Sequence, residues 1–352
     1  MLVPQTLTLI GVTFPEKIRG RAVGIWGSIA GTASIIGPLA GGVLIDGLSW
    51  RWVFLINLPI AALVVVLGLR SLPTEATWPV RLDLVGTFLA GIGLVALLYG
   101  CLQGPHAGWD LLTIACLPFA VFCLFVFFRY ERRVDPAHAV FPQSLRRNPR
   151  FLVAAVFGLF VALGVFALTF LVSNYIQSVL GQTAFWAGAA LAPASIASVV
   201  TAPIAGRWVD EGEARLVLQI GFGASAVGTA LSMLIAAMGG SWVWFLGATV
   251  VFGIGNGFVM APLTTVGMTA LRGDEFGAAS SLLNVLRQAG PVLGGAVVGL
   301  LMQMLAAMPT EVDPLGISSS VVAWVLGVPL LLFIVGLFVY SFVPSSMVSA
   351  ID

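Results

Sequence analysis

Charged residues are scarce in this sequence. Only 9% of its 352 residues are Asp, Glu, Lys or Arg, whereas about a quarter are charged in an ordinary soluble domain. Hydrophobic residues make up 59% of the chain, the mean hydropathy is +1.05, and a soluble fold cannot bury that much apolar surface. The sixteen basic residues are spread between apolar segments and form no basic stripe, so nothing indicates a nucleic-acid partner. The composition therefore predicts a membrane protein that has the lipid bilayer as a partner.

Groups that could carry enzyme chemistry are also scarce. The chain has two histidines, three cysteines and a single lysine. Lys17 lies in the sequence Phe-Pro-Glu-Lys-Ile, so no Gly-x-x-x-x-Gly-Lys phosphate-binding loop is present. The cysteines have no spacing typical of metal ligands or of a disulfide framework, and no nucleophile triad is apparent. We therefore expect no enzyme activity, no ATP-driven pumping, no cofactor and no metal site.

Ten segments are long and apolar enough to cross a bilayer as helices, which takes about 20 residues each. They are Arg21–Ile45, Trp52–Leu69, Leu84–Leu102, Leu111–Phe128, Leu152–Val172, Phe185–Ile204, Leu216–Met238, Trp242–Ala261, Gly277–Leu305 and Ser319–Val343. The preceding segment Leu2–Val12 would reach about 17 Å as a helix, against a hydrocarbon core of about 30 Å. We interpret it as the end of an eleventh helix. The sequence predicts an all-α polytopic membrane protein.

Basic residues fall on alternate connections between these segments, and the positive-inside rule assigns those connections to the cytoplasm. Fourteen of the sixteen lie there, while Arg51 lies on the opposite side and Arg287 lies inside a predicted span. This alternation predicts a multi-pass protein of the inner (plasma) membrane with a cytoplasmic C-terminus.

A pattern of arginine, glycine and proline occurs twice, 253 residues apart and without gaps. The first copy is Arg19, Gly20, Gly24, Gly37, Pro38, Gly41 and Gly42, and the second is Arg272, Gly273, Gly277, Gly290, Pro291, Gly294 and Gly295. Both copies run outward from a cytoplasmic connection, as in parallel repeats related by an axis along the membrane normal. The repeat predicts two similar halves that face each other across a cavity.

Residues 31–42, with the sequence Gly-Thr-Ala-Ser-Ile-Ile-Gly-Pro-Leu-Ala-Gly-Gly, resemble the antiporter motif of the fourteen-helix drug:proton antiporters in the major facilitator superfamily. Residues 49–59 resemble that family's signature at the start of the sixth helix, and the patterns around Asn174 and Asn284 resemble its ninth and thirteenth helices. The resemblance covers essentially the whole chain. It implies the major facilitator fold and drug export, and it implies that Leu2–Val12 ends the fourth helix, so that the first three are absent from this sequence.

The same resemblance divides the chain into three parts. Residues 1–69 would hold the remainder of the N-terminal helical half, that is, the end of the fourth helix and the fifth and sixth. Residues 70–150 would hold two extra central helices and a polar cytoplasmic linker, and residues 151–352 would hold a C-terminal half of six helices.

Arg287 lies about ten positions into an apolar helix, where a charge costs about 2.5–3.5 kcal/mol on insertion scales. Asn284, Arg287, Gln288 and Pro291 share one helix face at spacings of three, four and seven residues. This polar face is expected to look into the bundle or into a wet cavity. It could line a substrate cavity, or its side chains could form structural hydrogen bonds that hold neighbouring helices together.

Further cavity candidates are Asn174, Tyr175 and Gln177, which cluster near the outer end of one span. Tyr175 could equally belong to the interfacial aromatic belt. Asn256, which lies among glycines, could contact substrate or could form a hydrogen bond between helices.

Glycines four residues apart let helix backbones approach closely, and a proline kinks its helix. We predict that the antiporter motif seals the two halves against each other during alternating access, with simple close packing as the alternative. The motif residues are Gly31, Gly37, Pro38, Gly41 and Gly42, and those of its repeat are Gly290, Pro291, Gly294 and Gly295.

At the cytoplasmic side, Arg207, Asp210 and Arg215 could form a charge latch that is made in one conformation and broken in another, or could lie in a solvated loop. Asp46 and Asp83 lie at helix ends, and no further role is expected of either.

None of the fifteen acidic residues lies deep in a predicted span, although proton antiport needs an intramembrane group that gains and loses a proton. Arg287 cannot release a proton at physiological pH, so a coupling carboxylate is expected in the missing helices. The sequence favours a secondary transporter that exports small amphipathic compounds in exchange for protons. The alternatives are a truncated, non-transporting membrane protein and a facilitator or importer of the same fold.

Overall fold

The computed structural model describes residues 33, 36–37, 39–71, 83–106, 109–134, 141, 143–268, 271, 276–306 and 319–342. Within these ranges the regular elements are all helices. They are α3 (Trp50–Leu55), α4 (Asn57–Ser71), α5 (Leu84–His106), α6 (Leu111–Glu131), α7 (Gln143–Arg147), α8 (Pro149–Asn174), the π-helix η1 (Tyr175–Val179), α9 (Ala184–Asp210), α10 (Ala214–Ala237), α11 (Trp242–Met268), α12 (Phe276–Ala306) and α13 (Ser319–Phe342).

The predicted all-helical membrane fold is confirmed. The described residues contain eight helices that are long and apolar enough to cross a membrane, and α5 supplies a shorter apolar helix, Leu84–Gly100. Nine of the ten predicted spans coincide with these helices. The span Arg21–Ile45 is described only in its later part, as the helical segment 39–47, and Leu2–Val12 lies outside the described residues.

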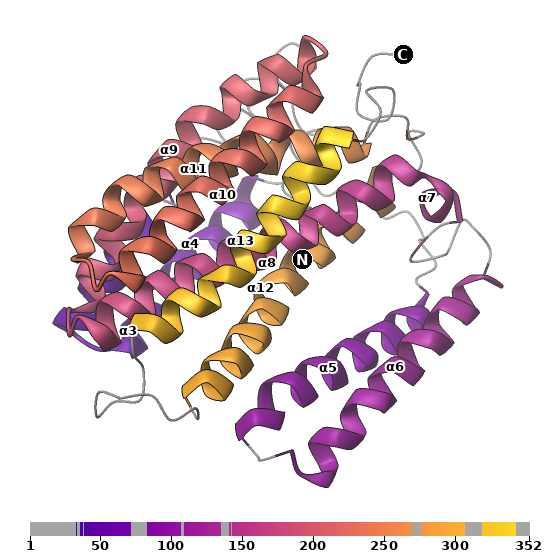
Figure 1. The fold of residues 1–352 in the computed structure, drawn as a ribbon. Coiled ribbons are helices and arrows are strands. Elements are labelled where there is room, and N and C mark those ends of the chain that lie inside the picture. Colours follow the sequence, from indigo (N-terminus) through magenta and orange to yellow (C-terminus); the bar gives the residue numbers. More distant parts are fainter. Residues whose placement is uncertain are drawn as a thin grey trace.

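Helices α8 to α13 pack into one bundle that contains most of the buried apolar side chains (Figure 1). Where the first turns of α8 meet the last turn of α13, the rings of Phe157, Phe222 and Tyr340 join α8, α10 and α13, with ring centroids 5.3 to 5.8 Å apart. These distances lie in the range that aromatic pairs favour. Gly336 makes room for this cluster, because a Cβ atom there would collide with the Phe222 ring.

Helices α5 and α6 form a separate hairpin that lies beside the bundle and contacts it through α12 (Figure 1). Asp83 caps α5 by accepting a hydrogen bond from the Gly86 backbone (2.9 Å), and it also accepts one from the Tyr130 hydroxyl of α6 (3.1 Å). Asp110 caps α6 through the Thr113 backbone (2.9 Å). The thiol of Cys123 is buried in this hairpin.

The polar stretch between the hairpin and the bundle is anchored at both of its ends. The buried Glu131 carboxylate accepts a hydrogen bond from the Phe141 backbone at 3.1 Å, and Arg146 donates to the Glu131 carbonyl at 3.3 Å. Leu145 of α7 is fully buried with Phe151 in a second apolar cluster that includes residues of α12. The linker assignment for this stretch remains a prediction, but α7 packs as part of the fold.

Candidate functional site

A cavity of about 400 Å³ lies within the membrane-spanning bundle, between α8, α9 and α11. Its volume is in the range of small-molecule sites. Its walls combine apolar and hydrogen-bonding side chains. They are formed by Val165, Thr169, Leu191, Ala194, Ser195, Ser198, Val199, Phe252, Gly253 and Asn256.

Close contact between α9 and α11 builds one side of this cavity. A Cβ atom at Gly253 would overlap the backbone of Ala194, and one at Gly257 would lie 2.7 Å from the Ser198 carbonyl oxygen. The buried Thr249 hydroxyl adds a hydrogen bond to the Ala190 carbonyl across the same contact, at 2.8 Å. These small residues allow the two backbones to approach, as at other membrane helix interfaces. The approach brings Asn256 opposite the serines of α9.

Asn256, which lines this cavity, carries a buried hydrogen-bonding atom that has no partner. Its Nδ2 atom donates to the Ser198 hydroxyl at 3.4 Å, while its Oδ1 atom is buried and has no hydrogen-bond partner in the structure. The Thr169 hydroxyl already donates to the Val165 carbonyl of its own helix at 2.9 Å. An unsatisfied buried acceptor costs about 1–3 kcal/mol. A rotation of the Asn256 side chain that presents Oδ1 to a ligand N–H or O–H group would remove this penalty.

Arg287 reaches toward the same region from α12. Its Nη2 atom donates to the Met260 sulfur at 3.4 Å, and Met260 lies one helical turn beyond Asn256 on α11. Asn284 is half-buried and Gln288 is exposed on the same face of α12. These three residues do not line the 400 Å³ cavity, and the exposed Arg287 contacts α11 at Met260, which is not a lining residue.

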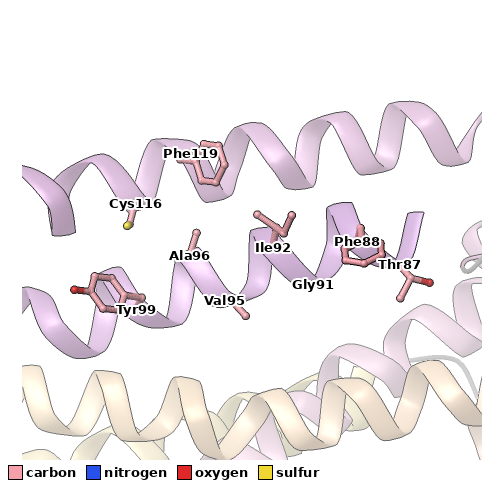
Figure 2. Close-up of a pocket in the computed structure, with 9 residues that line it drawn as sticks. All are labelled: Thr87, Phe88, Gly91, Ile92, Val95, Ala96, Tyr99, Cys116 and Phe119. Atoms are coloured by element: carbon pink, nitrogen blue, oxygen red, sulfur yellow. The ribbon is translucent and has the colours of Figure 1, made fainter. Parts of the chain in front are cut away.

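A larger cavity, of about 580 Å³, lies on the α5–α6 hairpin. Figure 2 shows its lining residues on these two helices, with Cys116 and Phe119 facing Ile92 and Ala96 across the gap. Its walls are almost entirely apolar, with Thr87 and Tyr99 as the polar exceptions. Recognition of a specific ligand needs a few converging polar groups. The smaller cavity supplies these, and the larger one does not.

A helical membrane bundle with an internal cavity of mixed polarity is an arrangement suited to a transporter. The sequence profile of the Major Facilitator Superfamily matches residues 1–295. The chain belongs to the major facilitator superfamily. This superfamily consists of membrane transporters and not of enzymes, so the predicted family and the predicted class of protein are both confirmed.

Several major facilitator relatives are named for drug resistance. Multidrug resistance protein Stp of Mycobacterium tuberculosis is 32% identical over 297 residues, which cover 84% of this chain and 55% of Stp. Methylenomycin A resistance protein of Bacillus subtilis is 29% identical over 314 residues, covering 87% of this chain and 66% of that protein. Puromycin resistance protein pur8 of Streptomyces alboniger is 33% identical over 311 residues, covering 84% and 60%. The chain therefore spans about half to two thirds of the length of these relatives.

The two copies of the major facilitator glycine motif contact different partners. In the second copy, a Cβ atom at Gly290 would lie 2.6 Å from the Ala162 side chain of α8, and one at Gly294 would lie 3.1 Å from the Leu163 carbonyl oxygen. The second copy therefore lies at the α8–α12 contact, inside the bundle of α8 to α13. Pro291 is half-buried on this helix, and Gly295 only borders the Phe166 ring.

In the first copy, Gly42 lies against the start of α9, where a Cβ atom would come within 2.7 Å of the Phe185 Cα. A Cβ atom at Gly37 or Gly41 would meet nothing within 4 Å among the described residues. Gly31 and Pro38 lie outside the described residues. The sealing role predicted for this motif stays a prediction.

The polar cluster at the C-terminal end of α8 does not line the cavity. Tyr175 is fully buried, and its hydroxyl donates to the Gly240 carbonyl at 2.9 Å, which ties η1 to the turn between α10 and α11. Gln177 is exposed and donates to the Ser173 hydroxyl at 2.8 Å. Asn174 is half-buried, and its Oδ1 atom has no partner. In this conformation Tyr175 therefore acts as a structural hydrogen-bonding residue.

Arg215, near the start of α10, binds the last turn of α13. Its guanidinium donates to the Tyr340 carbonyl at 3.3 Å and to the Ser341 carbonyl. Basic side chains commonly satisfy helix-terminal carbonyls in this way. Arg207 is exposed, and the side chain of Asp210 lies outside the described residues. The predicted latch between these residues stays a prediction.

Sequence reasoning missed most of the polar wall of the cavity. Ser195 and Ser198 are three residues apart on an apolar helix and therefore share a face, which was the available signal. Thr169 gave no such signal, because an isolated threonine in a span often bonds to its own helix. Asp46 was also missed as an interacting residue, since nothing in the sequence shows that it meets α9.

Proposed function

We propose that this protein exports small amphipathic compounds in exchange for protons and that it binds them in the α8–α9–α11 cavity. The observation that carries the proposal is the unsatisfied Oδ1 atom of Asn256 in a cavity bounded by membrane-spanning helices. The resistance proteins to which the chain is similar support drugs as the substrate class. The inner membrane, with a cytoplasmic C-terminus, is the proposed location.

The cavity suits a compound with an apolar body and one hydrogen-bond donor. Leu191, Val199 and Phe252 provide apolar surface, and the serines of α9 with Asn256 provide a polar edge. No charged side chain lines the cavity in the described part of the chain. Arg287 contacts Met260, one turn of α11 beyond Asn256, so a cationic group held toward that turn would be disfavoured and an anionic one attracted. The site therefore favours an amide, a hydroxyl or an amine held near Asn256 and away from Arg287.

The proposal that export is coupled to protons rests on the resemblance to the drug:proton antiporters and on the similarity to the resistance proteins. The acidic residues of the described helices lie at their ends, as Asp46, Asp83, Asp110 and Glu131 do, and none lines the cavity. A facilitator or an importer would use the same cavity without export. A non-transporting membrane protein would bind no substrate there.

Transport into everted membrane vesicles tests the proposal. We expect energised uptake of a fluorescent lipophilic amine that is collapsed by a protonophore. Asn256→Leu should raise the KM for this compound by roughly tenfold, because a hydrogen bond from the ligand to a buried acceptor is lost. Val250→Ala, on the exposed face of the same helix, is the matched control and should leave the KM unchanged.

Each alternative gives a different result. Uptake that continues unchanged with protonophore would contradict proton coupling and favour a facilitator. A correctly inserted protein that moves none of a broad panel of amphipathic compounds would contradict the export function itself.

A further inference from the structure

Asp46 makes a contact that joins two parts of the chain far apart in sequence. Its carboxylate accepts hydrogen bonds from the backbone N–H groups of Ala184 (3.2 Å) and Phe185 (2.9 Å), which are the first two residues of α9. The Thr183 hydroxyl also donates to it. This corrects the expectation that Asp46 only terminates its own helix.

The contact supplies the N-terminal cap that α9 lacks. Helices leave their first four N–H groups unsatisfied, and an Asp, Asn, Ser or Thr at the N-cap position usually accepts from them. Thr183 occupies that position of α9, but its side chain makes no capping hydrogen bond. The acceptor comes instead from Asp46, 138 residues earlier.

Gly42 allows Asp46 to reach this position. The two residues are four apart on the helical segment 39–47 and therefore lie on the same face. A Cβ atom at Gly42 would lie 2.7 Å from the Phe185 Cα and 2.9 Å from its nitrogen, and these backbone atoms cannot rotate away as a side chain can. The close approach and the carboxylate cap form one contact, which we name the Asp46 contact.

Among the described residues up to Ser71, few other interactions hold the chain against the bundle. Among the residues of α3 and α4 whose burial the structure describes, none is buried, so these two helices add no packed interface with the bundle. The Asp46 contact also lies at the membrane side where α9 begins, which the distribution of basic residues assigns to the outside. It therefore links the first part of the chain to the second half at the outer surface.

The helix that receives the cap also builds the cavity. Leu191, Ser195 and Ser198 of α9 line it, beginning about two turns below Phe185. Pro193 lies between the cap and most of these residues and lacks a backbone N–H, so the helix can bend there. Movement of the capped end of α9 would therefore change the outer wall of the cavity.

We propose that the Asp46 contact is an outer latch between the two halves, which is formed while the cavity is closed to the outside and broken when it opens there. The proposal rests on the proposed transport cycle but not on any particular substrate. Its test measures opening without substrate, so a failure to find an exported compound would not decide it.

The test measures how fast a membrane-impermeant thiol reagent, added outside intact cells, labels Ser195→Cys in a background where Cys101, Cys116 and Cys123 are alanine. We expect Asp46→Ala to speed labelling by about fivefold, the factor that corresponds to loss of a typical N-cap. The matched control is Asp110→Ala, which removes an aspartate cap from α6 on the same membrane side, but a cap supplied within its own hairpin. Equal labelling rates in the two variants would overturn the latch.

A second variant keeps the proposal testable if Asp46→Ala fails to insert. Asp46→Cys combined with Thr183→Cys places two thiols at the contact. Oxidation to a disulfide should slow the external labelling of Ser195→Cys, and reductant should restore it. If labelling proceeds at the same rate with the disulfide formed, the cavity opens without breaking the contact, and the proposal is wrong.

Discussion

At the scale of single residues, the place of a polar side chain in the fold decides whether it has a hydrogen-bond partner. Tyr175 and Asn256 were both candidates for the cavity. The structure buries the Tyr175 hydroxyl against the Gly240 carbonyl, and it leaves the side-chain oxygen of Asn256 without a partner in the wall of a cavity. The sequence shows that both side chains are polar and lie in apolar surroundings. It does not show which of them finds a partner, because that depends on residues 65 positions away.

Asp46 is a second residue whose partners the sequence does not show. Its pKa lies below the ordinary value of a carboxyl, first because the Thr183 hydroxyl donates to it and then because the Phe185 backbone does. The charged group nearest in sequence is Arg51, whose guanidinium lies over the Trp50 ring, and the first turn of α9 carries no acidic residue. Hydrogen bonds to the ionised form therefore account for the shift.

This shift predicts how the outer latch responds to pH. A lowered pKa means that the ionised carboxylate favours the formed contact, so its contribution is present above the ordinary carboxyl pKa and is lost as the pH falls below it. The ratio of Ser195→Cys labelling rates, Asp46→Ala over the parent, should stay constant from pH 7.5 to 5.5 and approach one below about pH 4. Taking the ratio cancels the effect of pH on the thiol. A ratio that has already fallen at pH 5.5 would show that another group controls the contact.

At the scale of helices, length and hydropathy were sufficient to locate the spans. A bilayer sets a minimum length for an apolar helix, so runs of about 20 apolar residues mark where helices cross. The glycine repeat was also visible. Its partners were not, because a glycine permits close approach on any side of the helix. Gly290 meets α8 in the same bundle, whereas a Cβ atom at the corresponding Gly37 would meet nothing within 4 Å in the described part of the chain.

The α8–α12 contact gives a test at this scale. Gly290→Ala would place a Cβ atom 2.6 Å from the Ala162 side chain and 2.9 Å from the Leu163 nitrogen, so the helices must separate. We expect a loss of about 1–3 kcal/mol in the free energy of unfolding, seen as a lower Tm of the purified protein in detergent. Gly299→Ala on the same helix meets nothing within 4 Å and should not lower the Tm. Similar Tm values for the two variants would contradict this account of the packing.

At the scale of the molecule, the family and the helical fold followed from the sequence, but the cavity did not. The cavity is assembled from α8, α9 and α11, and its lining depends on how each helix is rotated about its axis. Apolar residues lie on almost every face of these three helices, so hydropathy says little about how each helix is rotated about its axis. The close backbone contacts of Gly253 and Gly257 fix that rotation, and only the folded chain shows them.

The most direct test of the account is whether a transported compound occupies the α8–α9–α11 cavity. Ser198→Cys, in a background where the three native cysteines are alanine, places a thiol beside Asn256. The measurement is its rate of labelling by a thiol reagent with and without a compound that the protein exports. We predict that the compound slows labelling in proportion to its occupancy, with half-protection near its KM, and does not slow labelling of a cysteine at Val250. Labelling that is unaffected by saturating compound, in a protein that still exports it, would show that transport does not use this cavity.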